Sequence, residues 1–473
     1  MQLTIYFSTI DWIVFTLCLL LTYFVVWMGQ KAKAKSTAQD EHSNFLDHLL
    51  MGRRLTLPLF TATLVATWYG GIFGVTQIAF EKGLFNFLTQ GIFWYGTYII
   101  FALFFAKKVR ESNAITLPDL VKKQFGTKSS YLSAFLNFFN ILPITYVISV
   151  GLFIQFFTNG NLTQSMLLGT CLVVAYSLYG GFRAVVFSDL VQFFLMCSSV
   201  FFVFILSIQK FGGLGFLQAN LPANHLSLTG GESIATIFVW GFIALSTLVD
   251  PNFYHRCFAA ESTKTAQKGI FISTLIWICF DICTTFGALY AKATIPHVDS
   301  NLAYLQYGMT ILPNGLRGLF AAGILATIFS TLDSYLFLAG TTISVDLVPK
   351  KHRFKKIFHH IAVIFSASLA FSLALIFDGN IKSVWKSLGS LSAGSLLLPL
   401  ALSQLKAIKL SDHQFFITCL FSCLAMFLWK IKISALMNLN IDTLYIGILI
   451  SGICIFISQL TPSHNLTSKN KAK

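Results

Sequence analysis

A carboxylate and several hydroxyl groups lie in an otherwise uncharged stretch of the chain, GILATIFSTLDSYLFLAGTTIS (323–344). An unpaired carboxylate in hydrocarbon costs about 2.5–3.5 kcal/mol on insertion scales, so Asp333 should have a partner. Oxygen ligands without His or Cys suit a small hard cation such as sodium. Close helix packing through small residues is the alternative. On helical spacing, Asp333 would lie at the edge of one face of the helix. That face would carry Gly323, Thr327, Ser330, Thr331, Ser334 and Thr341.

Two other stretches contain residues that interrupt helices. In TATLVATWYGGIFGVTQIAF (61–80), a Trp-Tyr pair is followed by three glycines. In a transporter such a segment can unwind and expose carbonyls at the bilayer midplane, although close helix packing would also favour glycine. FVWGFIALSTLVDPNFYHR (238–256) predicts a second break at Asp250-Pro251.

A third stretch, YSLYGGFRAVVFSDLVQFFLM (176–196), predicts a tight hairpin followed by a helix. Its glycine pair and Arg183 mark the turn, and Asp189 with Gln192 lies in the helix. These two side chains could line an exit path for an ion. Equally, Asp189 could stabilise the N-terminus of that helix.

The elements that position these residues must lie in a membrane. The chain of 473 residues is 55% hydrophobic and 11% charged, against about 45–50% and about 25% in soluble domains. Its apolar blocks have the length that spans a bilayer as a helix. We therefore predict an all-α polytopic membrane protein with thirteen spans, near 9–30, 55–80, 85–106, 131–157, 164–181, 185–208, 232–250, 268–291, 316–345, 357–377, 383–403, 412–430 and 440–460.

The charge distribution predicts how the chain is oriented. The formal net charge is +15, and most of the Lys and Arg residues fall in alternate short loops. Because such residues gather on the cytoplasmic side, we expect the N-terminus outside and the C-terminus in the cytoplasm. The same pattern argues against a nucleic-acid partner, while KKHRFKK (350–356) could touch anionic membrane lipid. The loops so assigned include Arg53, Lys107, Lys128, Arg183, Arg256 and Lys356.

Nothing in the sequence indicates catalysis. The nine Cys residues are scattered, mostly within predicted spans, and packing explains them best. There is no phosphate-binding glycine loop, zinc signature or nucleophile elbow. We expect a protein that is not an enzyme and has no cofactor.

Four stretches in the same order resemble the sodium:solute symporter family, whose members carry proline, pantothenate, choline, iodide or glucose. The resemblance covers residues 45–350, and the flanking spans fit the family's thirteen-helix layout. The four stretches are LLMGRRLTLPLFTATLVATWYGGIFG (49–74), YSLYGGFRAVVFSDLVQ (176–192), DPNFYHRCFAAESTKTAQKG (250–269) and LFAAGILATIFSTLDSYLFLAGTTISVDLV (319–348).

The resemblance implies a leucine-transporter-type fold with two inverted five-helix repeats, each opening on a broken helix. Residues 1–52 would form the first span and a cytoplasmic linker. Residues 53–231 and 232–403 would form the two repeats. Residues 404–473 would form peripheral spans and a short cytoplasmic tail.

The resemblance also implies a sodium site between the first broken helix and the helix within 319–345. The hydroxyl ligands map to Ser330 and Thr331, and an acidic position associated with sodium coupling maps to Asp333. The carbonyl ligands map to Ala66, Tyr69 and Thr327. The solute would contact Trp68, Gly70, Gly71 and Tyr95, unless Trp68 is a packing residue.

The function that the resemblance implies is sodium-coupled uptake of a small organic solute across the plasma membrane, the inner membrane in a bacterium. The solute would be choline or another amine, an amino acid such as proline, or a carboxylate. The expected partners are this solute, sodium as the coupling ion and membrane lipid, and the sequence identifies no protein partner. The alternative is a proton-coupled or passive facilitator of the same fold.

Overall fold

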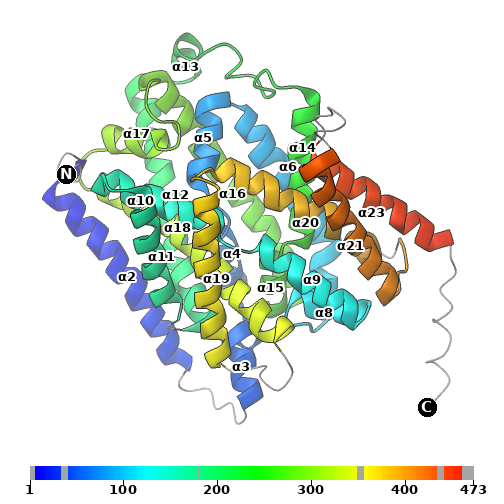
Figure 1. Ribbon diagram of the computed structural model, residues 1–473. Coiled ribbons are helices and arrows are strands. Elements are labelled where there is room, and N and C mark those ends of the chain that lie inside the picture. The colour runs from blue at the N-terminus through cyan, green and yellow to red at the C-terminus, as the bar shows by residue number, and fades with distance from the viewer. Residues whose placement is uncertain are drawn as a thin grey trace.

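The computed structural model describes residues 6–33, 41–178, 180–348, 356–405, 407–433 and 442–460. Over these ranges the regular structure is helical, apart from one isolated bridge between Leu55 and Ala260. Figure 1 shows a bundle of long helices, with α2 (Thr9–Lys33) along one edge and α23 (Thr443–Leu460) along the opposite edge. The predicted all-α polytopic class is confirmed.

The predicted spans are all found. In the described residues, ten helices are long and apolar enough to cross a membrane, and three shorter apolar helices occupy the other predicted spans. Between α2 and α23 these spans correspond to α4 (Leu57–Ala66) with α5 (Ile72–Lys82), α6 (Phe93–Ile100), α9 (Thr127–Asn140) with α10 (Ile144–Thr158), α11 (Leu162–Ser177), α12 (Gly181–Phe211), α14 (Ile234–Ala244), α16 (Thr263–Thr294), α18 (Leu316–Thr341), α19 (Lys356–Ile376), α20 (Ile381–Gln404) and α21 (Asp412–Leu428). The span of α14 continues through α15 (Pro251–Ala259), beyond its predicted end at residue 250.

Both predicted breaks are present. The first separates α4 from α5, and glycine is required there for close approach as well as for unwinding. A Cβ atom on Gly70 would overlap the side chains of Thr331 and Tyr146, and one on Gly71 would overlap Trp385. The second break joins α14 to α15 through a 3-10 turn and Asp250, whose backbone is extended.

A third interruption was not predicted. We expected one continuous helix over 131–157, but α9 ends at Asn140 and α10 begins at Ile144. Pro143 lies between them, and a proline lacks the N–H that a continuous helix needs at that point. Its presence in the sequence was the available signal.

Three of the loops between predicted spans contain the following short helices. They are α3 (Glu41–Leu50), α13 (Leu214–Asn220) and α17 (Ala303–Ile311). The loop assignment of Arg256 was wrong, because this residue lies inside α15 and is fully buried. Lys128, Arg183 and Lys356 also lie in helices, each in the first turn of its helix. The stretch 350–355 and residues Lys406 and 461–473, which also entered the charge argument, lie outside the described residues.

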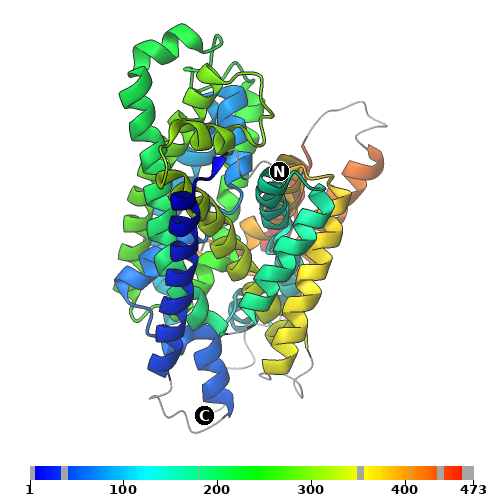
Figure 2. The same cartoon turned by 90° about the vertical axis from the view of Figure 1, so that its left-hand side faces the viewer.

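The core is centred on α18, most of whose residues are buried, and α18 packs against α12 and α2. Gly323 gives α18 close contact with Ser199 of α12, and Gly318 gives it close contact with the backbone of Asp11 in α2. By contrast, α2 is largely exposed, as Figure 2 shows by its position on the outside of the bundle. Its exposed apolar side chains are those expected to face lipid.

Candidate functional site

Four oxygen atoms from α4 and α18 converge where α4 ends. The hydroxyl of Ser330 donates to the carbonyl of Ala66 at 2.7 Å and lies 3.1 Å from that of Thr327. The hydroxyl of Thr331 lies 3.1 Å from the carbonyl of Thr327 and 3.4 Å from that of Ala66. The end of α4 supplies its carbonyl because the last carbonyls of a helix have no partner within the helix. The structure thus brings together four of the six residues predicted to bind sodium.

Tyr69 follows these oxygens in the unwound segment, and its side chain turns toward α16. Its hydroxyl donates to Asp281, and its ring lies against Phe280 with 4.3 Å between the ring centroids. The proposed role of its backbone carbonyl stays a prediction.

Asp333 lies apart from the four oxygens. It is buried and accepts a hydrogen bond from Ser177 of α11. The next residue, Ser334, accepts one from Arg256 at 3.1 Å. The expectation that Asp333 has a partner is therefore met by a protein hydroxyl, and its role in sodium coupling stays a prediction.

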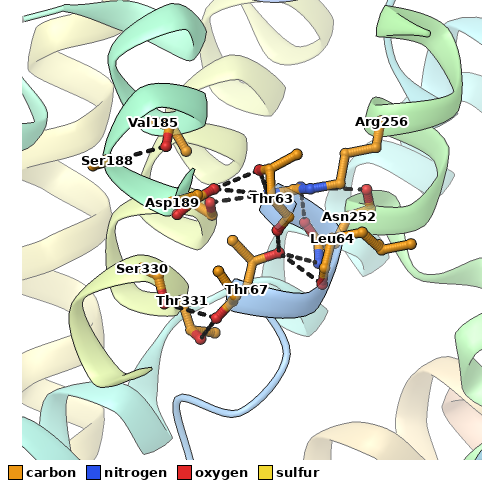
Figure 3. A network of polar contacts seen from close by, with 12 residues as sticks. Thr63, Leu64, Thr67, Val185, Ser188, Asp189, Asn252, Arg256, Ser330 and Thr331 are labelled. Atoms are coloured by element: carbon orange, nitrogen blue, oxygen red, sulfur yellow. Dashed lines mark hydrogen bonds and ion pairs between the residues drawn. The ribbon is translucent and has the colours of Figure 1, made fainter. Parts of the chain in front are cut away.

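Asp189 belongs to a buried network around Arg256 (Figure 3). Thr63 donates its hydroxyl hydrogen to Asp189 and accepts a hydrogen bond from Arg256 at 3.0 Å. The guanidinium lies 3.7 Å from the carboxylate and also donates to Asn252. Both charged side chains are completely buried.

The alternative role for Asp189, at a helix N-terminus, was wrong. Its helix α12 begins at Gly181, and the dipole effect fades beyond the first turn. Among the described residues, the carboxylate oxygen Oδ1 of Asp189 has no hydrogen-bond partner. The predicted exit path therefore stays open as an interpretation.

A cavity of about 150 Å³ lies next to the two breaks. Trp68, Tyr69 and Gly71 line it, as expected for residues predicted to contact solute or ion, whereas Gly70 and Tyr95 do not. The described lining is Trp68, Tyr69, Gly71, Val75, Gln90, Trp94, Asn140, Leu142, Thr145, Tyr146, Trp240, Ile243, Ser246, Asp250, Tyr335, Val384 and Trp385.

Trp68 lines the cavity and also packs against other rings, while its contact with the solute stays a prediction. Besides lining the cavity, its ring packs edge-to-face against Tyr98 at 5.5 Å and against Phe253 at 5.3 Å. Such pairs fix the orientation of an aromatic ring. Packing therefore holds Trp68 in place at the cavity wall.

Sequence reasoning missed Asp281. This buried carboxylate of α16 accepts hydrogen bonds from Tyr69 and Tyr95, and so links the unwound segment to α16 and α6. The available signal was a single acidic residue within a predicted span, which is the signal that identified Asp333. No group of three or more His, Cys, Asp or Glu that could hold a metal occurs in the described part of the chain.

The model of the sodium:solute symporter family matches residues 48–407 of this chain. The chain belongs to this family. It is 24% identical over 344 residues to the high-affinity proline transporter PutP of Bacillus subtilis, covering 67% of this chain and 71% of the relative. It is 25% identical over 351 residues to the sodium/glucose cotransporter 4 of Mus musculus, covering 63% of this chain and 51% of the relative.

The fold of this symporter is also found in a solved structure of a Na⁺-coupled sialic acid symporter. The TM-score is 0.76 at 16% identity, covering 96% of this chain and 98% of that chain. The resemblance inferred from the four sequence stretches is confirmed. Because the family and these relatives are transporters, the expectation that the chain is not an enzyme is confirmed as well.

Proposed function

We propose that this symporter takes up a small organic solute together with sodium, which binds between α4 and α18. The convergence of the Ala66 and Thr327 carbonyls with the Ser330 and Thr331 hydroxyls carries the proposal. A hydroxyl hydrogen rotates to suit its partner, so these oxygens can also turn lone pairs toward a cation. Uncharged oxygen ligands of this kind suit a hard cation.

Three other residues have supporting roles in the proposal. Tyr69 supplies a further carbonyl from the unwound segment, which is where broken helices coordinate coupling ions. Asp333 and Asp189 lie on the two helices that pack most centrally, α18 and α12, and would attract sodium along its route. Sodium is the coupling ion, and no cofactor is invoked.

The solute would bind in the cavity beside the breaks, with Trp68 and Gly71 in its wall. The relatives are named for proline and glucose, so family membership leaves the solute open among amines, amino acids, carboxylates and sugars. The two repeats, 53–231 and 232–403, would move relative to each other to expose this cavity alternately on the two sides. Gly70 and Tyr95 would act indirectly, by packing against Thr331 and by bonding Asp281.

We further propose the plasma membrane as the location, with the N-terminus outside and the C-terminus in the cytoplasm. The support is the concentration of basic residues in alternate loops. This pattern remains when Arg256 is removed from the count. Single cysteines tested in a Cys-free background would check it. An impermeant thiol reagent added to intact cells should label Thr229→Cys but neither Lys107→Cys nor Lys264→Cys, and the reverse pattern would contradict this orientation.

The experiment that tests the coupling is uptake into proteoliposomes with an inward sodium gradient. A tenfold gradient corresponds to about 1.4 kcal/mol, and a potential of about 100 mV adds about 2.3 kcal/mol per charge. Replacing sodium by potassium should abolish accumulation of the transported solute. Accumulation that persists in potassium and follows a proton gradient would favour the proton-coupled alternative, and equilibration without accumulation would favour a passive facilitator.

A further inference from the structure

The wall of the cavity is aromatic and carries one charge. Four Trp and three Tyr side chains line it, and Asp250 is the single charged residue among the lining residues that the structure describes. The remaining polar groups are uncharged: Gln90, Asn140, Thr145 and Ser246. Aromatic faces attract cations through the ring quadrupole. In water the net gain is largest for a weakly hydrated organic ammonium, because it loses little hydration on entering the cavity.

The carboxylate of Asp250 has a structural role that does not need its charge. One oxygen accepts a hydrogen bond from the backbone N–H of Asn252 at 2.7 Å and so caps α15. The other accepts one from the hydroxyl of Tyr335 at 3.2 Å. Asparagine caps helices about as well as aspartate, so capping leaves the negative charge unexplained.

No basic side chain on the described cavity wall balances this charge. Arg256, further along the same helix, attracts Asp250 electrostatically. Its guanidinium makes its direct contacts with Asp189, Thr63 and Ser334 instead. A carboxylate beside a cavity in the membrane favours a cation there. Sodium would need several oxygen ligands in a tight cage, whereas the neighbouring groups here are mainly rings.

We propose that the solute carries an ammonium group, which the aromatic rings surround and Asp250 neutralises. This inference rests on the proposed function and narrows it, since it favours amines and amino acids over sugars and simple carboxylates. Tyr335 positions the carboxylate through its hydroxyl and packs edge-to-face on Tyr146, with 5.1 Å between the ring centroids. A cavity of about 150 Å³ has room for several waters, and so for a small amine.

The test is binding to the full-length protein in nanodiscs at saturating sodium, followed by tryptophan fluorescence. The ammonium probes are choline, glycine betaine and tetramethylammonium. The matched neutral probe is 3,3-dimethyl-1-butanol, in which carbon replaces the nitrogen of choline, and glucose and acetate represent the other classes. We expect at least one ammonium probe to bind at least ten times more tightly than the neutral probe, glucose and acetate.

The decisive variant is Asp250→Asn, which keeps the helix cap and removes the charge. It should weaken binding of the ammonium probe by roughly ten- to hundred-fold, as expected when a contact to a charge is lost. The matched control is Asp442→Asn, because Asp442 makes the same bond, to the N–H of Leu444 at 3.0 Å, at the start of α23. That variant should bind the probe as the parent does.

Two results would overturn the inference. One is that glucose, acetate or the neutral probe binds as tightly as every ammonium probe. The case in which no ammonium probe binds up to about 100 mM counts as the same result. The other is unchanged ammonium binding in Asp250→Asn. Probe binding measured in potassium instead of sodium separates this inference from the proposed function. If the ammonium probe binds equally well in potassium, the sodium coupling fails while the ammonium site stands.

Discussion

Single hydroxyl groups decide how well the site between α4 and α18 can hold a cation. Ser330 and Thr331 are both within hydrogen-bond distance of the carbonyls of Ala66 and Thr327, and all four residues are buried. Removing one hydroxyl from such a site leaves a bound cation short of one oxygen. Water has little access to replace that oxygen.

We predict that Ser330→Ala and Thr331→Ala each raise the sodium concentration for half-maximal uptake by roughly ten- to hundred-fold. The loss of one bond to a charge, about 1.5–3 kcal/mol, gives this range. Thr331→Ser should have a mild effect because it keeps the oxygen. The control is Ser366→Ala, which removes a buried hydroxyl that bonds to the carbonyl of Ala362 in its own helix α19. Unchanged sodium dependence in both alanine variants would show that the hydroxyls only pack.

The unwound segment between α4 and α5 is held by contacts with several other helices. Gly70 lies against Thr331 of α18, Gly71 lies against Trp385 of α20, and Tyr69 donates to Asp281 of α16. A shift of the segment would therefore move a cavity wall and a carbonyl beside the proposed sodium site together. This linkage is a physical route by which solute and sodium could affect each other's binding.

We predict that Gly70→Ala abolishes most sodium-dependent uptake while the protein still inserts in the membrane. Its Cβ atom would overlap Thr331, whose Cβ and hydroxyl are buried and cannot move aside easily. The control is Gly96→Ala on α6, where an added Cβ meets nothing within 4 Å. That change should leave uptake intact and stabilise the helix by up to about 1 kcal/mol. Equal uptake by both variants in the same vesicles would contradict the close packing.

Across the whole molecule, ion pairs lie on both sides of the first break. Before it, Thr63 of α4 joins the buried Arg256–Asp189 pair, which connects α4, α12 and α15. After it, Glu81 of α5 pairs with Lys382 of α20 at 2.8 Å, with both side chains about one-third exposed. Since exposed pairs contribute little and buried ones are sensitive to loss of a partner, the two should behave differently.

We predict that Arg256→Met and Asp189→Asn are each strongly destabilising, by about 3–5 kcal/mol, because the remaining charge is left buried and unpaired. The double variant should be less destabilised than the worse single variant. Glu81→Gln, in the exposed pair, should cost about 1 kcal/mol or less. Thermal unfolding of the purified variants in one detergent measures all four. Additive losses in the double variant would mean that the two charges do not compensate each other.

The span count and the breaks could be predicted because they depend on local sequence. Apolar blocks set the spans, and glycines and Asp250-Pro251 set the breaks. The assignment of Ser330 and Thr331 to the proposed sodium site came from the resemblance to the family. Pro143 carried the same kind of local signal and was overlooked.

The partners of the buried charges could not be predicted in this way. Asp281 is separated by 212 residues from Tyr69, and Asp189 is paired with Arg256 of another helix. A sequence shows that a buried charge needs a partner, but it does not show which distant residue supplies that partner. For the same reason Arg256 was assigned to a loop. That Asp250 lines an aromatic cavity could be seen only in the folded structure.

The contact between Asp11 and the start of α18 constrains how the protein is made. Asp11 accepts hydrogen bonds from the N–H groups of Gly315 and Gly318, at 2.7 and 3.0 Å, and 304 residues separate Asp11 from Gly315. At about 5–20 residues per second, a ribosome needs roughly 15–60 s to make the intervening chain. During that time the carboxylate has only the neighbouring Ser8 as a partner among these contacts. Helix α2 is made long before α18, and it can therefore be fixed in its final position only after α18 has been made.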